Sequence, residues 1–210
     1  MKNKLLWSIL NVVAISVLTF GVTYAYYEAS SSEKKFTGEA QGGINTALTL
    51  TKTYIASDLV PLSDSLVTTA ISKTTNKCID KSGYEVCSLY QITLTNTASS
   101  ENIYGYIRTS SSTYTTDNLK YQIFNSSFSA LTDIMTLSKT ADETVYFQKD
   151  SESYSVTSTG TTTYYLAIWL TDTGEEQSED YSKTFSGYIG FELVGSSGLE
   201  EGKIEAQFEA

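Results

Sequence analysis

The sequence contains no histidine among its 210 residues. Histidine is the commonest general base, the usual zinc ligand and the side chain that changes charge near neutral pH. Its absence excludes every function that depends on an imidazole. The sequence also has no G-x-S-x-G motif, and its thirteen glycines form no dinucleotide or phosphate loop. We therefore predict that the chain is not an enzyme, with no catalytic residues, cofactor or metal site to assign.

Basic residues are also scarce, and Arg108 is the only arginine. The formal net charge is −10. Lys2 and Lys4 are the only charged residues among the first 25, so residues 26–210 carry 12 basic and 24 acidic side chains, a net charge of −12. Such a surface repels phosphate backbones, which argues against nucleic-acid binding.

Proline occurs once, at Pro61, so the chain lacks the composition of a proline-rich disordered protein. What it has instead is 40% hydrophobic residues and sixteen tyrosines, together with abundant threonine and serine. This composition supports a buried core and favours pleated, half-buried strands. The length fits one domain with a targeting segment.

The N-terminus is typical of export. Lys2 and Lys4 precede Leu5–Ala25, a stretch of uncharged and mostly apolar residues. A basic start, an apolar stretch and small residues at its end form a secretory signal pattern. We expect a signal peptidase to cleave after Ala25, with Thr23 and Ala25 as the small residues and Tyr26 as the new N-terminus.

The alternative is an uncleaved membrane anchor through residues 5–25, since about 20 apolar residues span a bilayer. A buried soluble helix is a third interpretation. Both leading readings export the domain to the cell surface or beyond, because Lys2 and Lys4 hold the N-terminus inside.

The two cysteines agree with an exported location. Cys78 and Cys87 flank a turn centred on Ser82 and Gly83. Outside the reducing cytosol, two cysteines this close are expected to form a disulfide. A two-residue hairpin turn places Cys78 opposite Cys87, whereas a three-residue loop with a bulge shifts the pairing by one residue.

After the targeting segment, residues 26–43 are polar with three aromatic outliers, Tyr26, Tyr27 and Phe36, and we interpret them as an extended N-terminal arm. Residues 44–210 contain short alternating runs separated by turn residues, which predict an all-β, antiparallel sandwich or barrel. The expected strands cover residues 47–55, 84–95, 103–108, 119–124, 144–148, 162–171, 185–194 and 202–210. The last of these also has some helical character, but its alternation favours a strand.

The most hydrophobic run, residues 162–171, is apolar on both faces. Tyr164, Leu166, Ile168 and Leu170 share one face, and residues 165, 167 and 169 share the other. This pattern predicts a central strand that is covered on both sides. Its aromatic residues could form a carbohydrate platform, but core packing is the simpler interpretation.

The acidic loop at residues 172–180 follows this strand. Calcium prefers such oxygen ligands, but the EF-hand spacing is absent. We interpret the loop as a solvated hairpin connection.

Four segments together resemble the TasA/camelysin family of secreted bacterial matrix-fibre proteins. These are FGVTYAYYEASSS, FTGEAQGGINTALTLT, CSLYQITLTNTAS and YYLAIWLTDTGEEQSEDYSKTFSGYIGFEL. The resemblance implies a jelly-roll-like β-sandwich, export through a dedicated signal peptidase, and fibres in which the arm of one subunit completes the sheet of the next. Some relatives are zinc peptidases, but without histidine that activity is not carried over. The Cys78–Cys87 hairpin is a departure from the best-known members.

These observations lead to two functional hypotheses. The first is a structural subunit of a cell-surface or biofilm-matrix fibre, which self-associates when its arm, with Tyr26, Tyr27 and Phe36, inserts as a strand into a neighbouring copy. The alternative is a monomeric, membrane-tethered surface domain with a binding or adhesion role. Sequencing the N-terminus of the exported protein discriminates between them.

Overall fold

The computed structural model describes residues 36–37, 46–56, 59–72, 77–96, 102–156, 160–194 and 200–209. Regular structure in these ranges is almost entirely β-strand, and every ladder between named strands is antiparallel. The chain is therefore all-β, as its alternating sequence predicts. Residues 35–210 form one compact unit.

Six strands form the first sheet, which we call the β13 sheet after its central strand. In spatial order they are β1 (Phe36–Thr37), β2 (Thr46–Tyr54), β5 (Ser88–Asn96), β13 (Gly160–Leu170), β7 (Leu119–Asn125) and β8 (Met135–Thr136). Sequence neighbours are therefore often not neighbours in this sheet, because β13 inserts between β5 and β7.

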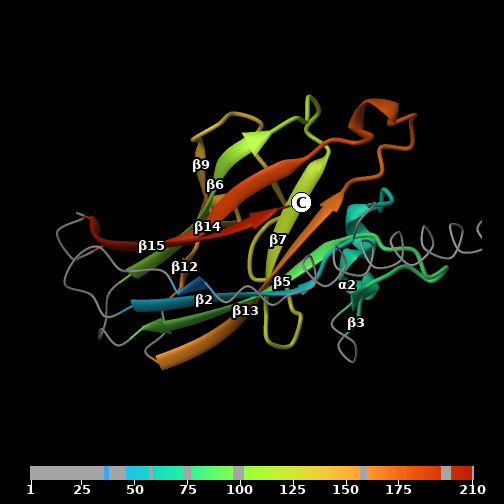
Figure 1. The fold of residues 1–210 in the computed structure, drawn as a ribbon. Helices are drawn as coiled ribbons and strands as arrows, with labels where there is room; N and C mark the ends of the chain where they lie inside the picture. Colours follow the sequence, from blue (N-terminus) through green and yellow to red (C-terminus); the bar gives the residue numbers. More distant parts are fainter. Residues whose placement is uncertain are drawn as a thin grey trace, which may run out of the picture. The chain divides into compact units, whose positions relative to one another are not determined.

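Five strands form the second sheet, which we call the β14 sheet. The main path is β12 (Ser155–Val156), β6 (Asn102–Ser112), β14 (Phe185–Val194) and β15 (Glu200–Glu209), and β9 (Thr144–Tyr146) also pairs with β6. Figure 1 shows β6, β14 and β15 in one layer and β2, β5 and β13 in the other.

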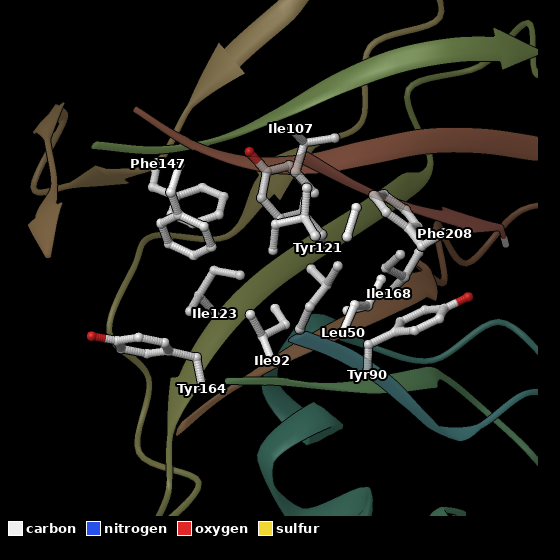
Figure 2. Packing of buried hydrophobic residues seen from close by; sticks show 14 of the residues in the cluster. Leu50, Tyr90, Ile92, Ile107, Tyr121, Ile123, Phe147, Tyr164, Ile168 and Phe208 are labelled. Atoms are coloured by element: carbon white, nitrogen blue, oxygen red, sulfur yellow. The ribbon is translucent and has the colours of Figure 1, made fainter. Parts of the chain in front are cut away.

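The main core lies between the two sheets and is built by alternate residues of their strands. The β13 sheet contributes Leu166 and Ile168 from its central strand, and the β14 sheet contributes Ile189 and Phe191. Figure 2 shows this layer from close by, with Phe208 of β15 beside Tyr90 of β5. The period-two pattern of the sequence therefore specifies which face of each strand is buried.

A second cluster covers the opposite face of the β13 sheet. Ala167 and Trp169 of β13 pack there against the segment 59–87, which includes Val67 and the two cysteines. This segment contains η1 (Asp64–Leu66), the four-residue helix α2 (Val67–Ala70) and the two-residue strands β3 (Ile71–Ser72) and β4 (Lys77–Cys78). The prediction that residues 162–171 form a strand covered on both sides is confirmed.

The remaining short elements are β10 (Gln148–Lys149), its hairpin partner β11 (Glu152–Ser153), and η2 (Ser178–Asp180) in the acidic loop. The structure differs from the sequence-based expectations at one strand and adds one helix. The strand expected from Tyr84 begins only at Ser88, because the preceding residues belong to the cysteine hairpin. The short helix α2 was not expected, since four residues are too few to show a helical period.

Candidate functional site

The edge of the β13 sheet at β2 takes a strand from the arm. Phe36 pairs with Leu50 and Thr37 pairs with Thr49, so β1 extends the sheet by one short strand. Leu50 is buried in the main core. The alternation of threonine with leucine along β2 suits a strand with one buried face. Phe36, the predicted arm residue within the described ranges, therefore lies in a sheet rather than in a free tail.

β2 has a regular ladder over most of its length and a bulge near its end. Its register with β5 is continuous from Thr46 to Lys52 and shifts between Lys52 and Tyr54. Thr53 sits at this shift, and its hydroxyl is buried without a hydrogen-bond partner among the residues described. Bulges interrupt pairing and increase twist. The regular part of the edge that an added strand can follow is thus Thr46–Lys52.

The edge of the β14 sheet at β15 runs beside β2 (Figure 1). The hydroxyl of Tyr90 on β5 donates a hydrogen bond to the main-chain carbonyl of Glu209, which ties the end of β15 to the β13 sheet. The two edges differ in charge. β15 carries four glutamates and one lysine, whereas β2 carries four threonines and a single lysine. Charged side chains on an edge strand disfavour pairing with a further strand, so β2 is the better of the two edges for adding one.

The outer face of the β14 sheet carries a charged and aromatic network around the only arginine. The guanidinium of Arg108 on β6 donates two hydrogen bonds to the carboxylate of Glu205 on β15, of 3.0 Å from Nε and 2.6 Å from Nη2. The same guanidinium stacks 4.4 Å above the ring of Tyr188 on β14. Tyr106 donates a further hydrogen bond of 2.9 Å to Glu205. Lys203 Nζ lies 3.3 Å from Glu205. The network therefore joins three neighbouring strands across this face.

This network shifts the pKa of its members. Burial raises the pKa of Glu205, but hydrogen bonds from Arg108 and Tyr106 outweigh it and hold the pKa at about 2. Burial and the neighbouring carboxylate of Glu205 both raise the pKa of Tyr106. The hydrogen bond to Glu205 raises the pKa of Arg108. All three groups therefore keep fixed protonation states near neutral pH. Such groups suit a structural role, holding three strands together, better than proton transfer.

Gly190 makes room for this network. A Cβ at Gly190 would lie 2.1 Å from the ring carbon Cζ of Tyr106. Tyr106 is fully buried although it lies on the outer face, because its ring lies over the glycine and beneath Tyr146 and Lys203. The ring of Tyr106 therefore fills the space that a side chain at position 190 would take.

The acidic loop is pinned at one end by a buried carboxylate. Asp180 accepts hydrogen bonds from Asn118 Nδ2 at 2.7 Å, from Gln177 Nε2 at 3.3 Å, and from the Thr116 hydroxyl. Its partners are neutral donors. Within the described ranges, no group of three or more histidine, cysteine, aspartate or glutamate residues is placed to hold a metal ion. The end of the loop is thus held by Gln177 of the loop itself and by Thr116 and Asn118, which precede β7.

Cys78 and Cys87 form a disulfide with a Cα–Cα distance of 5.3 Å, and both are fully buried. Ile79 is bridged to Glu85, and the amide of Gly83 donates to the carbonyl of Asp80. The hairpin therefore has the three-residue loop with Gly83 at a φ of +86°, and the pairing that places Cys78 directly opposite Cys87 is wrong by one residue. Two amides, those of Ser82 and Tyr84, also donate to the carboxylate of Asp80, which favours this wider turn.

The aromatic residues of β13 are core residues. Trp169 is fully buried, Tyr164 belongs to the main core and Tyr165 packs on Phe128 with ring centroids 4.4 Å apart. They do not form a surface platform for carbohydrate. Sequence reasoning missed the tyrosines of the outer β14 face, because only the pairing of β6, β14 and β15 brings them together.

Several predicted positions lie outside the described residues. These are the cleavage residues Thr23, Ala25 and Tyr26, the arm residue Tyr27, and the signal or anchor segment 1–25. In the part of the chain that the structure covers, no helix is long and apolar enough to cross a membrane.

Comparison with known proteins assigns no family. No protein-family profile matches the sequence, and no curated protein matches it. Among solved structures, the putative ApaA protein from Bordetella pertussis matches over 79% of this chain and 92% of that chain, with 10% sequence identity and a TM-score of 0.29. A similarity this low carries no functional argument.

Proposed function

We propose that this protein is a non-enzymatic, exported structural subunit of a cell-surface or biofilm-matrix fibre, in which the N-terminal arm of one copy pairs with the β2 edge of the next. The observation that carries the proposal is the pairing of Phe36 and Thr37 with Leu50 and Thr49. In this pairing the β2 edge carries a strand from the arm of its own chain, which supports the same pairing between copies. Main-chain hydrogen bonds at such an edge supply affinity, and the alternating side chains supply the register.

The core beneath the edge supports the proposal. Leu50 lies in the main core at the β2 margin, and directly opposed residues in an antiparallel pair share a face of the sheet. Residue 36 of an incoming arm would therefore take the register position opposite Leu50. The threonine-rich edge offers no repelling carboxylate to the incoming strand.

Export is supported by the disulfide, which is compatible with an oxidising location. The two-sheet arrangement with a shared core is the framework that a jelly-roll-like sandwich requires, and we propose that architecture for the domain. The resemblance to the TasA/camelysin family motivates both proposals. Signal peptidase and the export machinery are the partners that the N-terminal segment implies.

The test is assembly of the exported protein with and without its arm. Residues 26–210 should form concentration-dependent oligomers or fibres in sedimentation and negative-stain imaging, whereas a chain beginning at Gly38 should remain monomeric and folded. Assembly should strengthen with salt or at lower pH, because the net charge of −12 outside the first 25 residues opposes it. If both chains sediment as monomers at high concentration and moderate salt, the proposal fails.

A matched pair of variants separates the role of the arm from a general loss of aromatic surface. Replacing Tyr26, Tyr27 and Phe36 with serine should reduce assembly while the β signature in circular dichroism is retained. The control replaces Tyr84 and Tyr181, which are 60% and 80% exposed and lie far from the arm in sequence, with serine. The control should assemble like the unaltered protein.

The second candidate is a monomeric domain tethered through residues 5–25 that binds a surface partner. It is favoured by the outer β14 face, where Arg108 lies over the ring of Tyr188 and Lys203 lies over the ring of Tyr106, which packs against Tyr146. Sequencing the N-terminus of the exported protein tests it. A start at Tyr26 excludes the tether, and a start at Met1 supports it.

A further inference from the structure

We propose that the pairing of β1 with its own β2 is an autoinhibitory contact, and that the same pairing in the same register, made with the β2 edge of a second copy, is the contact of assembly. The inference rests on the proposed function and adds its regulation. The partner of the β2 edge is thus a second copy of this chain. Thr37 of one copy lies opposite Thr49 of the other.

The ladder itself is the first argument. The pairs Phe36–Leu50 and Thr37–Thr49 define an antiparallel register that depends only on the two strands and not on which chain supplies them. Exchange of an identical element between copies conserves every contact within that element. The balance between the closed monomer and the exchanged form is therefore decided by the connection between the strands and by concentration.

The size of the closed contact is the second argument. β1 comprises two residues, whereas the regular edge of β2 extends from Thr46 to Lys52. A two-residue strand contributes few hydrogen bonds and opens at low cost compared with global unfolding. In the exchanged form, a longer stretch of the arm can pair with the β2 edge of the second copy and form more of the ladder along Thr46–Lys52.

The connection between the strands is the third argument. Residues 38–45 join β1 to β2, and three of them, Gly38, Gly42 and Gly43, are glycines. Because only eight residues join the two strands, the closed pairing has an effective concentration on the order of millimolar. The closed form therefore predominates in dilute solution. Exchange becomes favourable where the protein is concentrated or where a growing fibre adds further contacts. This keeps newly exported chains monomeric until they meet a high local concentration.

The test is a reversible lock on the closed pairing in the mature exported protein. The double variant Thr37→Cys/Thr49→Cys, oxidised in dilute solution, joins β1 to its own β2. The matched control is Thr95→Cys/Thr161→Cys, which places an engineered bond between β5 and β13, where these two threonine hydroxyls are 2.9 Å apart on the exposed surface. Both variants keep the buried Cys78–Cys87 disulfide, which a mild reductant reaches poorly.

The locked variant should remain monomeric at concentrations where the unaltered protein and the control assemble, and reduction should restore its assembly. A mixture of the single variants Thr37→Cys and Thr49→Cys should form mixed disulfide dimers in the assembled fraction and not in dilute monomer. If the locked protein assembles as well as the control, the autoinhibitory contact is excluded while the proposed function stands. If the unaltered protein never assembles, the proposed function fails and this inference fails with it.

Discussion

The indole Nε1 of Trp169 donates a hydrogen bond of 2.8 Å to Oδ1 of Asp64, a residue 105 positions earlier in the sequence. Trp169 lies on the central strand β13, and Asp64 begins the short helical segment that covers the outer face of that strand. The hydroxyl of Thr171 donates to the same carboxylate oxygen. One carboxylate therefore fixes the start of η1 to the C-terminal end of the central strand β13.

Removal of this carboxylate should destabilise the domain. Asp64→Ala leaves the buried indole N–H of Trp169 without its acceptor, so we expect the free energy of unfolding to fall by about 1–3 kcal/mol. Asp64→Asn keeps an oxygen at the same place and should lose less. Urea denaturation followed by tryptophan fluorescence measures both variants, and equal losses would contradict the role given to the hydrogen bond.

The hydroxyl of Tyr121 should be removable with a gain in stability. It is buried in the main core, and among the described residues it has no hydrogen-bond partner. Tyr121→Phe removes an unsatisfied polar group and should raise the free energy of unfolding by about 1 kcal/mol. Tyr90→Phe is the control, since it loses the hydrogen bond to Glu209 and should destabilise. A lower unfolding midpoint for Tyr121→Phe would show that its hydroxyl is satisfied in solution.

The disulfide should stabilise the domain without being required for its fold. Cys78 and Cys87 belong to the second cluster, on the face of the β13 sheet opposite the main core, and the main core does not include them. Replacing both with alanine should lower the free energy of unfolding by about 2–3 kcal/mol, as expected for a short closed loop, and should leave the β signature in circular dichroism unchanged. Intact mass before and after reduction and alkylation checks the bond itself. Alkylation of both thiols in the untreated, unfolded protein would disprove it.

Acid should weaken the contribution of Glu205. Its pKa falls from an ordinary 4.5 to about 2 in the folded protein. A lowered folded pKa adds stability above the unfolded value, and this contribution is lost as the pH falls from about 4.5 towards 2. Glu205→Gln should therefore cost about 1–3 kcal/mol at pH 7, allowing for partial exposure, and the difference from the unaltered protein should narrow below pH 4.5.

Denaturation at a series of pH values measures this difference. The exposed Glu152 is the control, since Glu152→Gln should change stability little at any pH. A Glu205→Gln deficit that stays constant down to pH 2 would mean that the loss comes from packing and not from the charge held by Arg108.

Local pattern was enough to locate the long strands and their buried faces, although β5 begins at Ser88 and not at Tyr84. The alternation of Leu166 and Ile168 with Ala167 and Trp169 required two covered faces, and period two leaves no other arrangement for such a strand. The same reasoning predicted β14 and β15. It could not specify the partner of each strand, because pairing depends on contacts between residues far apart in sequence. The insertion of β13 between β5 and β7 is visible only in the folded sheet.

The sequence by itself determined that the chain is acidic, all-β and without imidazole chemistry, since composition and alternation are local properties. Only the tertiary structure decided that Phe36 and Thr37 join the edge of β2, that Gly83 widens the cysteine hairpin by one residue, and that Arg108 meets Glu205. Each of these depends on the geometry of a turn or on the neighbour that another strand supplies. Such neighbours are set by the packing of the whole core, and no short stretch of sequence contains them.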